Sequence, residues 1–407
     1  MTQEKALEIL KGYDNVFLTG EPGAGKTYTI NQFTDWLDQK GICYAVTAST
    51  GIAASHINGT TIHSWSGIGI MKNLEEADIN GIRFAKFHYN RIKPVQVLIL
   101  DEVSMLDATF IDDLDKVLKA VHKKLDQPFG GVQVVVVGDF FQLPPVVKGG
   151  ETRFAFESEA WQQADMKVCY LTEQHRQTEP VFTDLLRSMR FGMVTNSHRE
   201  ILQSRMSSKE SPVHLFTHNA NVDQMNLEKL QQLPGENKTY YMSNSGNPKV
   251  VEILKRNCLS PDLLHLKEGA MVMFTANKPQ LGYVNGSVGE VVHLGKDGPS
   301  VKLIDGPTVT PERHSWKHLG SNKEVVASIS QFPLRLAWAI TVHKSQGMSL
   351  DTASIDLSRA FEYGHGYVAI SRVRSLEGLH LAGISEEAYM VNPKVMEQDK
   401  IFREKGV

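Results

Sequence analysis

The amino-acid sequence predicts an α/β protein, and three features of its hydrophobic pattern carry this prediction. Up to about residue 170, short apolar runs alternate with stretches of helical periodicity, which is typical of a parallel sheet with crossover helices. A second α/β unit begins near Val213. From Gly269 to about Gln331, valine-rich runs are separated by turn residues such as Asn285-Gly286, which predicts a small inserted β-barrel. At a typical size of about 150 residues per domain, 407 residues suffice for several domains.

The apolar runs of the first part give its expected strands and helices. Thr27–Lys40 has the periodicity of a helix, and Gly41 suits its end because glycine adopts the left-handed conformation without strain. Apolar residues from Leu106 to Val121 recur at helical spacing and predict a second helix. The segment Ser66–Lys93 does not fit this rhythm, and we interpret it as a small insertion. The expected strands are Val16–Leu18, Ile42–Val46, Val97–Leu100, Val132–Val137 and Val168–Leu171.

The part after residue 170 repeats the α/β rhythm around the predicted barrel. A helix is expected from Pro180 to about Arg190 and another through Leu227–Leu230. Expected strands are Val213–Phe216, Leu336–Ile340, Ala353–Ile355 and His380–Ala382.

Composition excludes several classes of protein. Hydrophobic residues make up 41% and charged residues 22%, the balance of a globular protein. The net charge is −3, so contact with a polyanion would need a local patch. Three scattered cysteines form no CxxC zinc motif and no disulfide framework. There is no apolar run of the roughly 18 residues that a membrane span needs, and no targeting signal is evident, so we expect a cytoplasmic protein.

A phosphate-binding loop is the most specific motif. Residues 20–27, Gly-Glu-Pro-Gly-Ala-Gly-Lys-Thr, match G-x-x-x-x-G-K-[ST] and lie between an apolar strand and a helix. The backbone N–H groups of Gly23, Ala24, Gly25 and Lys26 would cradle the β-phosphate, and the Lys26 side chain would reach the β- and γ-oxygens. The hydroxyl of Thr27 would bind Mg²⁺. The alternative is a glycine-rich turn that matches by chance.

Polar residues follow two other apolar strands. Asp101 is expected to hold Mg²⁺ through water, and Glu102 to orient and deprotonate the attacking water. Gln142, in Gly138-Asp-Phe-Phe-Gln-Leu-Pro-Pro145, is placed to sense a γ-phosphate. The alternative for Asp101 and Glu102 is an acidic helix cap, and the alternative for Gln142 is a surface glutamine.

Two arginines beyond the first α/β part, which ends near residue 170, complete the candidate catalytic set. Arg176 and Arg372 could stabilise the charge of the transferred phosphoryl group, although an arginine taken alone is more often a surface salt-bridge former. If both point at Lys26, the nucleotide lies in a cleft that hydrolysis opens and closes.

Taken in order, these and four further motifs resemble a superfamily-one DNA helicase of the 5′→3′ branch. The resemblance is closest to the petite-integration-frequency (PIF) helicase family, with RecD-like and Dda-type helicases as cousins. It covers the chain from Gln3 to about Ala382. The motifs are Gln3, the P-loop, Thr47–Ala54, Gly59–Ser64, Asp101-Glu102, Gly138–Pro145, Arg176, Ala339–Gly347 and Ser371-Arg372, together with Glu102–Leu106, Pro128–Gln133 and Leu336–Met348.

The resemblance implies two RecA-like motor domains that use ATP and Mg²⁺. The expected boundaries are 1–170 for the first motor, with a strand-separating wedge at about 66–93. The second motor would comprise 171–268 and 332–407, with a small β-barrel at 269–331. Gln3 would read adenine through its amide, and Gln346 and Gly347 would contact the nucleotide from the second motor.

The resemblance also implies DNA contacts made by hydroxyl, imidazole and amino groups, which suit phosphates without reading sequence. For both histidines of this set a structural role is the alternative. Trp65, Phe140 or Phe141 could stack on bases, although aromatic residues beside apolar strands are more often core. The expected contacts are Thr47, Ser49, Thr50, Thr61, His63 and Ser64 in the first motor, and Thr341, His343, Lys344 and Ser345 in the second.

The implied function is an ATP-dependent helicase that moves 5′→3′ on single-stranded DNA. Its substrates would be single/double-strand junctions such as forks, and G-quadruplexes, in repair, recombination and telomere maintenance. We expect the chain to translocate as a monomer and to have no membrane partner. We also expect a helicase of the bacterial or phage type. Two alternatives remain open: a single-strand translocase or clamp that does not unwind, and a P-loop ATPase that remodels proteins. A non-enzymatic nucleotide-binding module would not need the whole catalytic set.

Overall fold

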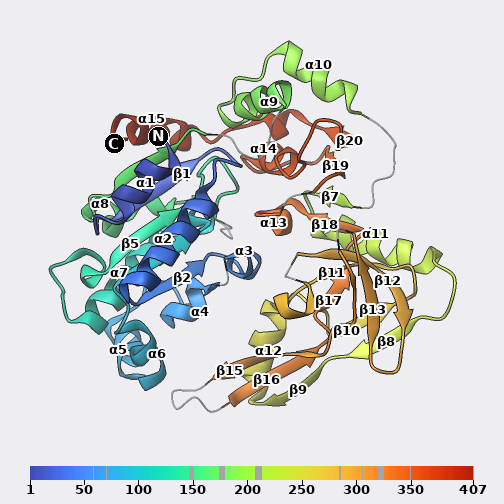
Figure 1. Cartoon of the computed structure of the whole chain (residues 1–407), viewed down its shortest axis with the longest axis horizontal. Helices are drawn as coiled ribbons and strands as arrows, with labels where there is room; N and C mark the ends of the chain where they lie inside the picture. Colours follow the sequence, from blue (N-terminus) through green and yellow to red (C-terminus); the bar gives the residue numbers. More distant parts are fainter. Residues whose placement is uncertain are drawn as a thin grey trace. The chain divides into compact units, whose positions relative to one another are not determined.

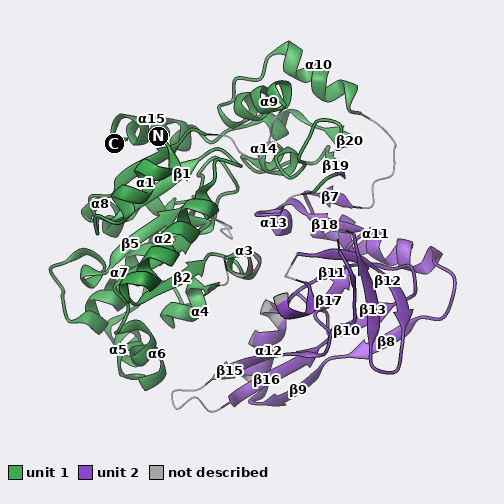
Figure 2. Cartoon of the chain, viewed as in Figure 1, with its two compact units in different colours: residues 1–208, 349–351, 355–407 green, residues 209–348, 352–354 purple. Residues whose placement is uncertain are grey.

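The protein forms two compact units (Figure 2). A computed structural model describes residues 1–406 except 58, 70, 146–150, 174–178, 207–212, 284–285, 305, 320–324 and 349. The first unit comprises residues 1–208, 349–351 and 355–407, and the second comprises residues 209–348 and 352–354. Across the described residues, every helix is too short or too polar to span a bilayer. These units are defined by packing, and the motor-domain boundaries given above remain a prediction.

The first unit is built on a six-stranded parallel sheet in the order β3-β2-β4-β5-β1-β6. This confirms the parallel sheet that the alternating pattern predicted, since each of the five expected strands is present within two residues of its expected start. Figure 1 labels β1, β2 and β5 of this sheet. The strands are β1 Val16–Gly20, β2 Tyr44–Ala48, β3 Thr60–Thr61, β4 Val97–Asp101, β5 Gln133–Val137 and β6 Lys167–Leu171.

Helices connect these strands and extend the first unit. Gly41 ends α2 in the left-handed conformation (φ 65°), as its residue type predicted. The expected second helix begins at Ala108, because the Asp107 side chain accepts a hydrogen bond from the Phe110 N–H and so caps it. The α-helices are α1 Gln3–Leu10, α2 Lys26–Lys40, α3 Gly51–His56, α4 Ile62–Ser66, α5 Glu76–Phe84, α6 Lys86–Ile92, α7 Ala108–His122, α8 Glu159–Gln163, α9 Pro180–Arg190, α10 Asn196–Ser204, α14 His365–Ile370 and α15 Pro393–Glu404. Short 3-10 helices are η1 Val103–Met105, η2 Pro128–Gly131, η3 Ala155–Glu157 and η5 Glu386–Tyr389, and two further strands are β19 Ala353–Leu357 and β20 Leu379–Ile384.

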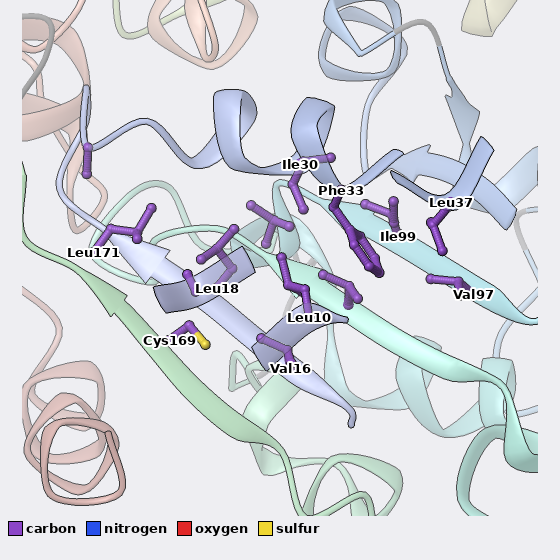
Figure 3. Packing of buried hydrophobic residues seen from close by; sticks show 14 residues of the cluster. Leu10, Val16, Leu18, Ile30, Phe33, Leu37, Val97, Ile99, Cys169 and Leu171 are labelled. Carbon is purple, nitrogen blue, oxygen red and sulfur yellow. The ribbon is translucent and has the colours of Figure 1, made fainter. Parts of the chain in front are cut away.

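The core beneath the nucleotide motif joins α1 and α2 to the sheet (Figure 3). Phe33 and Leu37 of α2 are fully buried and lie in one cluster with Val97 and Ile99 of β4. Cys169 of β6 belongs to the same cluster, and burial raises the pKa of its thiol to about 11, so it is an unreactive core residue. This packing fixes α2, and therefore the loop that precedes it, against the sheet.

The insertion at 66–93 is a pair of short helices, α5 and α6, that pack on α7. The Asp113 carboxylate of α7 accepts the Leu74 N–H at 3.0 Å, and Leu74 and Ile82 are buried. At the corner between the two helices, the Phe84 side chain is 73% exposed, and the Arg83 guanidinium lies 5.2 Å from the centre of its ring. The insertion therefore presents an aromatic side chain and basic neighbours on a fixed helical support.

The second unit combines helices with antiparallel sheets and with one parallel pair of strands, β7 and β18. The turn residues predicted hairpins, and β12, β13 and β14 are indeed consecutive antiparallel strands of a five-stranded sheet, β14-β13-β12-β11-β17. A separate three-stranded sheet, β15-β16-β9, recruits a strand from before the expected range. The strands are β7 His214–Phe216, β8 Lys238–Tyr241, β9 Ser243–Gly246, β10 Leu263–Leu266, β11 Met271–Phe274, β12 Val288–Leu294, β13 Pro299–Leu303, β14 Thr308–Val309, β15 His314–Leu319, β16 Val325–Gln331, β17 Leu334–Leu336 and β18 Ala339–Thr341; the helices are α11 Asn219–Gln232, α12 Pro248–Asn257, η4 Pro279–Leu281 and α13 Val342–Ser345.

Candidate nucleotide and DNA sites

The P-loop lies where its motif predicted, between β1 and α2. Gly23 (φ 87°) and Gly25 (φ 84°) both adopt the left-handed conformation, which other residues enter only with strain. Gly20 approaches β6 so closely that a Cβ would lie 2.7 Å from the Leu171 carbonyl oxygen. The loop therefore needs glycine at these positions, and it opens directly into the N-terminus of a 15-residue helix, where N–H groups and the helix dipole favour phosphate.

The Lys26 side chain is folded onto its own loop. Its Nζ donates hydrogen bonds to the carbonyl oxygens of Gly20 at 2.8 Å and Glu21 at 3.2 Å. Burial lowers the pKa of this ammonium, against the opposing effect of the nearby carboxylates of Asp139 and Glu102. An anionic phosphate would therefore find a cation already positioned inside the loop.

Asp101 and Glu102 stand at the carboxyl end of β4. Because β4, β5 and β1 are adjacent parallel strands, their carboxyl ends share one edge of the sheet with the P-loop. Burial, and then the charge of Glu102, raises the pKa of Asp101 to about 7. Glu102 has φ 53°, a left-handed conformation that is costly for a residue with a side chain, and its N–H donates to Asp101 Oδ1 at 2.8 Å. Strain of this kind is typical of functional sites.

The residues at this edge suit a magnesium ion. The Thr27 hydroxyl and the Asp101 carboxylate are hard oxygen donors of the type that Mg²⁺ prefers. A carboxyl group whose pKa is raised to about 7 carries its charge poorly in the protein alone, and a divalent cation would stabilise the ionised form. The donor set therefore fits the metal that the P-loop motif implies.

A buried ion pair follows β5. Asp139 and Arg190 are almost inaccessible to solvent, and the Arg190 guanidinium donates from Nη2 to Oδ1 at 2.8 Å and from Nε to Oδ2 at 3.1 Å. The Tyr367 hydroxyl donates to the same Oδ2 at 2.9 Å. Burial would raise the pKa of Asp139, but the charge and hydrogen bonds of Arg190 outweigh burial and hold the pKa below its ordinary value. Sequence reasoning missed Arg190 and Tyr367, although both lie close to predicted motifs.

Gln142 lies in the turn that this carboxylate organises. Its N–H donates to the Asp139 carbonyl oxygen at 3.0 Å, and the Phe141 N–H donates to Asp139 Oδ1 at 3.2 Å. Phe140 and Phe141 are each only 5% exposed, as is Trp65. For these three aromatic residues the core interpretation is confirmed, since none is available to stack on a base.

Only one of the two candidate arginines lies among the described residues. Arg176 lies outside the described residues. Arg372 is 2% exposed, and its guanidinium donates to the Val368 carbonyl oxygen at 2.8 Å and to Ser371 Oγ at 2.7 Å. Its side chain is thus bonded to the helix α14 that precedes it, within the unit that holds the P-loop.

The resemblance predicts three further nucleotide contacts. Gln3 belongs to the first unit, and Gln346 and Gly347 belong to the second. Gln3 Nε2 donates to the Ala24 carbonyl oxygen at 3.4 Å, so its side chain lies against the P-loop. Gln346 is buried after α13, and Gly347 adopts the left-handed conformation with φ 83°. Their contacts with a nucleotide remain a prediction.

A second contact to the P-loop was not predicted. Arg187 of α9 donates from Nε to Oε1 of Glu21 at 3.1 Å. Arg187 and Arg190 are spaced i,i+3 and so share one face of the helix, a signal that could have identified both.

The predicted DNA residues of the first unit cluster at the ends of β2 and β3. Thr47 is fully buried, and its hydroxyl donates to the Ile99 carbonyl oxygen at 2.8 Å. Thr50 Oγ1 accepts the Ala53 N–H at 3.2 Å, whereas Ser49 Oγ is buried with no hydrogen-bond partner among the described residues. A buried hydroxyl without a partner is costly, so Ser49 is the member of this set that a phosphate would satisfy best.

The α4 residues of the same set are more open. Thr61 is half-buried at the N-cap position of α4, and Ser64 is exposed, with its carbonyl oxygen accepting Arg91 Nη2 at 2.8 Å. The His63 ring lies 4.4 Å from the Phe110 ring, centre to centre. Burial lowers the pKa of His63, against the raising effect of Asp107. Burial therefore favours the neutral imidazole over the charged form at this position.

In the second unit the predicted DNA residues lie on or beside α13. Two hydroxyls serve the local fold, since Thr341 caps the helix by accepting the Lys344 N–H at 3.3 Å and Ser345 Oγ donates to the Val342 carbonyl oxygen at 2.8 Å. Burial lowers the pKa of the half-buried Lys344, as does the neighbouring Arg335 charge. His343 is also half-buried. The Asp223 carboxylate opposes this effect, so one acidic group partly balances the two cations, Lys344 and Arg335, that favour an anionic ligand.

The fold and this site define a P-loop nucleotide hydrolase with RecA-like architecture. Comparison with known proteins identifies the family. Residues 5–200 match the family model described as PIF1-like helicase, and residues 249–294 match the model described as DNA helicase Pif1, 2B domain.

Relatives match over nearly the whole chain. An ATP-dependent DNA helicase Pif1 from Psychrobacter sp. is 40% identical, covering 99% of this chain and 71% of the relative, and one from Bdellovibrio bacteriovorus is 35% identical over 98% and 91%. The crystal structure of Pif1 helicase from Candida albicans has a TM-score of 0.89 at 34% identity and covers 98% of both chains. A Bacteroides Pif1 in complex with ADP-AlF3 and single-stranded DNA has a TM-score of 0.76 at 31% identity, covering 99% of this chain and 97% of that one. The chain belongs to the PIF1-like helicase family.

Proposed function

We propose that this chain is an ATP-dependent DNA helicase that moves 5′→3′ along single-stranded DNA and separates duplexes at forks and other single/double-strand junctions. The observation that carries the proposal is the convergence of the P-loop, Asp101-Glu102 and the Asp139–Gln142 turn on one sheet edge, in a chain of this family. The relatives bear the name ATP-dependent DNA helicase, which supports both the cofactor and the substrate.

In the proposed hydrolysis, each polar group of the sheet edge has one task. Lys26 leaves its carbonyl partners to bind the β- and γ-phosphates. Glu102 orients and deprotonates the attacking water, and Gln142 contacts the γ-phosphate. Mg²⁺, held by Thr27 and by Asp101 through water, would neutralise the charge that develops on the phosphates. Arg176 and Arg372 would stabilise the transferred phosphoryl group.

Single-stranded DNA would contact the polar residues at the ends of β2 and β3 in the first unit, and those around α13 in the second. The Bacteroides relative was crystallised with single-stranded DNA, which supports this class of ligand. Hydroxyl and backbone groups bind phosphates without reading sequence, so we expect little sequence preference. Each unwinding step must overcome about 1.4 kcal/mol of stacking per base pair, which is small beside the work available from ATP.

One copy of the chain is proposed to translocate. A related structure is titled as unwinding of forked duplex DNA by two coordinating Pif1 helicases, so a second copy at the fork is the alternative for strand separation. The named relatives include bacterial proteins, and on this ground we propose a cytoplasmic location.

The insertion at 66–93 is proposed to separate the strands, and Phe84 is the place to test it. Removing the whole insertion would expose core around Leu74 and Ile82, whereas the Phe84 side chain is 73% exposed and can be removed without opening the core. If the insertion is the wedge, Phe84→Ala lowers the unwinding rate while DNA-stimulated ATP hydrolysis stays within about twofold of wild type. Leu125→Ala, at a side chain 75% exposed, is the matched control. Equal unwinding by both variants would contradict the wedge assignment of Phe84.

ATP hydrolysis with and without single-stranded DNA separates the proposal from a protein-remodelling ATPase. A helicase hydrolyses ATP slowly alone and much faster on the strand. Hydrolysis at the same rate in both conditions would favour the remodelling ATPase, and stimulation without strand separation would favour a translocase.

A further inference from the structure

Helix α14 is packed directly on the turn that carries Gln142. Gly364, the residue before the helix, adopts φ 81° and lies so close that a Cβ would be 2.7 Å from the Phe141 carbonyl oxygen and 3.1 Å from that of Gln142. No residue with a side chain fits this contact without moving the turn. The backbone of α14 and the backbone of the turn therefore touch.

Tyr367 adds a specific bond to this contact. It lies on the first turn of α14, is 2% exposed, and donates its hydroxyl to Asp139 Oδ2 at 2.9 Å. The other Asp139 oxygen accepts the Phe141 N–H and an Arg190 N–H. One carboxylate thus connects α14, α9 and the turn.

The same helix also carries a candidate catalytic arginine. Arg372 follows α14 by two residues and donates from Nε to the Val368 carbonyl oxygen within it. Movement of α14 would therefore move the Arg372 side chain and, through Tyr367 and Gly364, the turn that holds Gln142.

We propose that Tyr367 and Arg190 are positioning residues for hydrolysis: they fix Asp139, and through it they hold the Gln142 turn in register with α14 and Arg372. This inference rests on the proposed ATP hydrolysis and extends it. It makes the γ-phosphate contact and the arginine two parts of one rigid assembly, so both reach the transferring phosphoryl group together. A merely structural role would affect folding stability but not the preference for the transition state.

The substitution Tyr367→Phe tests the proposal because it removes one hydroxyl and keeps the buried ring. Because the turn loses one of the bonds that hold it on α14, we expect kcat for DNA-stimulated hydrolysis to fall about tenfold. The KM for ATP and the affinity for ADP stay within about twofold, because the P-loop is untouched. The affinity for ADP with aluminium fluoride, which mimics the transferring phosphoryl group, falls in parallel with kcat.

Tyr44→Phe is the matched control. The Tyr44 hydroxyl donates to Asp38 Oδ2 at 3.2 Å in the same unit, and no catalytic or binding role is assigned to it. This variant should keep wild-type kcat and wild-type affinity for ADP with aluminium fluoride.

A double-mutant cycle with Gln142→Ala identifies the route of the effect. If Tyr367 acts through the Gln142 turn, the double variant is no slower than the slower single variant. Once the Gln142 side chain is absent, loss of the Tyr367 hydroxyl has no Gln142 contact left to disturb. Additive losses would overturn the proposal, and so would an equal loss of affinity for ADP and for ADP with aluminium fluoride. Arg190→Lys, which keeps the charge but loses the two-point contact, should reproduce the kcat defect if Tyr367→Phe does not fold. A wild-type chain without DNA-stimulated hydrolysis would instead refute the proposed function.

Discussion

Asp139 and Arg190 form a two-point ion pair whose side chains are 0% and 1% exposed. The guanidinium also lies 4.2 Å from the centre of the Phe141 ring, and its Nη1 donates to the Tyr170 hydroxyl at 2.7 Å. Tyr170 in turn donates to Asp399 of α15. The segment after β5 is therefore joined to α9 and to the C-terminal helix by one polar network, which is buried at Asp139 and Arg190 and half-buried at Tyr170.

Removing one member of this pair should destabilise the protein strongly. Asp139→Asn leaves the Arg190 charge buried without its partner, a change that typically costs about 3–5 kcal/mol of unfolding free energy. Urea denaturation measures this cost. Asp14→Asn breaks the exposed pair with Lys167 at 2.6 Å and should cost less than about 1 kcal/mol. Similar losses in the two variants would show that the buried pair contributes no special stability.

Lys26→Ala should abolish ATP hydrolysis. The variant removes the cation that lies inside the phosphate-binding loop, and loss of one such electrostatic contact lowers kcat by about a hundredfold or more. Lys40→Ala, at the exposed end of the same helix, is the control and should hydrolyse ATP normally. Turnover retained in Lys26→Ala would mean that the loop does not bind the transferred phosphates.

Glu102→Gln should separate binding from hydrolysis. The amide has the shape of the carboxylate but cannot accept the proton of the attacking water, so ATP and DNA bind while turnover slows by about a hundredfold or more. Equilibrium binding of a fluorescent nucleotide and steady-state hydrolysis give the two quantities. Glu8→Gln, at an exposed position of α1, should change neither. Normal turnover in Glu102→Gln would exclude this side chain as the base.

His63 should make folding stability depend on pH. Burial lowers its pKa in the folded protein below the ordinary value of 6.5, so the unfolded chain binds a proton more readily than the folded one. The contribution of His63 to folding stability is therefore constant well above pH 6.5, where both states are neutral. It falls as the pH drops through about 6.5, where the unfolded chain takes up the proton. His63→Gln should lose less stability between about pH 7.5 and pH 5.5 than wild type, as measured by urea denaturation. Leu125→Ala, at an exposed side chain that does not titrate, should keep the wild-type pH dependence, and an unchanged pH dependence in His63→Gln would contradict the account.

The sequence was sufficient for features that depend on local pattern. The P-loop, the strands and the polar residues at their ends follow from short-range periodicity and residue type, so the sheet edge proposed to bind phosphate could be predicted. The helices of the insertion were missed, although Glu75 and Asp78 form a capping box that marks the start of α5.

Long-range partners could not be predicted. Tyr367 and Asp139 are 228 residues apart, and only the fold shows that they are bonded. The hydrogen-bond partner of a single hydroxyl could not be predicted from the sequence either. Thr47 and Ser345 have the residue types of phosphate contacts, yet both hydroxyls donate to backbone carbonyl oxygens. Residue type at a strand end indicates a polar site, but burial and geometry decide which atoms remain for a ligand.

Strand separation from tailed duplexes tests the central claim most directly. The chain would be mixed with ATP, Mg²⁺ and a partial duplex that carries either a 5′ or a 3′ single-stranded tail, and release of the displaced strand would be followed by fluorescence. The account predicts ATP-dependent separation of the 5′-tailed duplex and none of the 3′-tailed one. Separation only from the 3′ tail, or no separation from either tail while the chain hydrolyses ATP on single-stranded DNA, would contradict it.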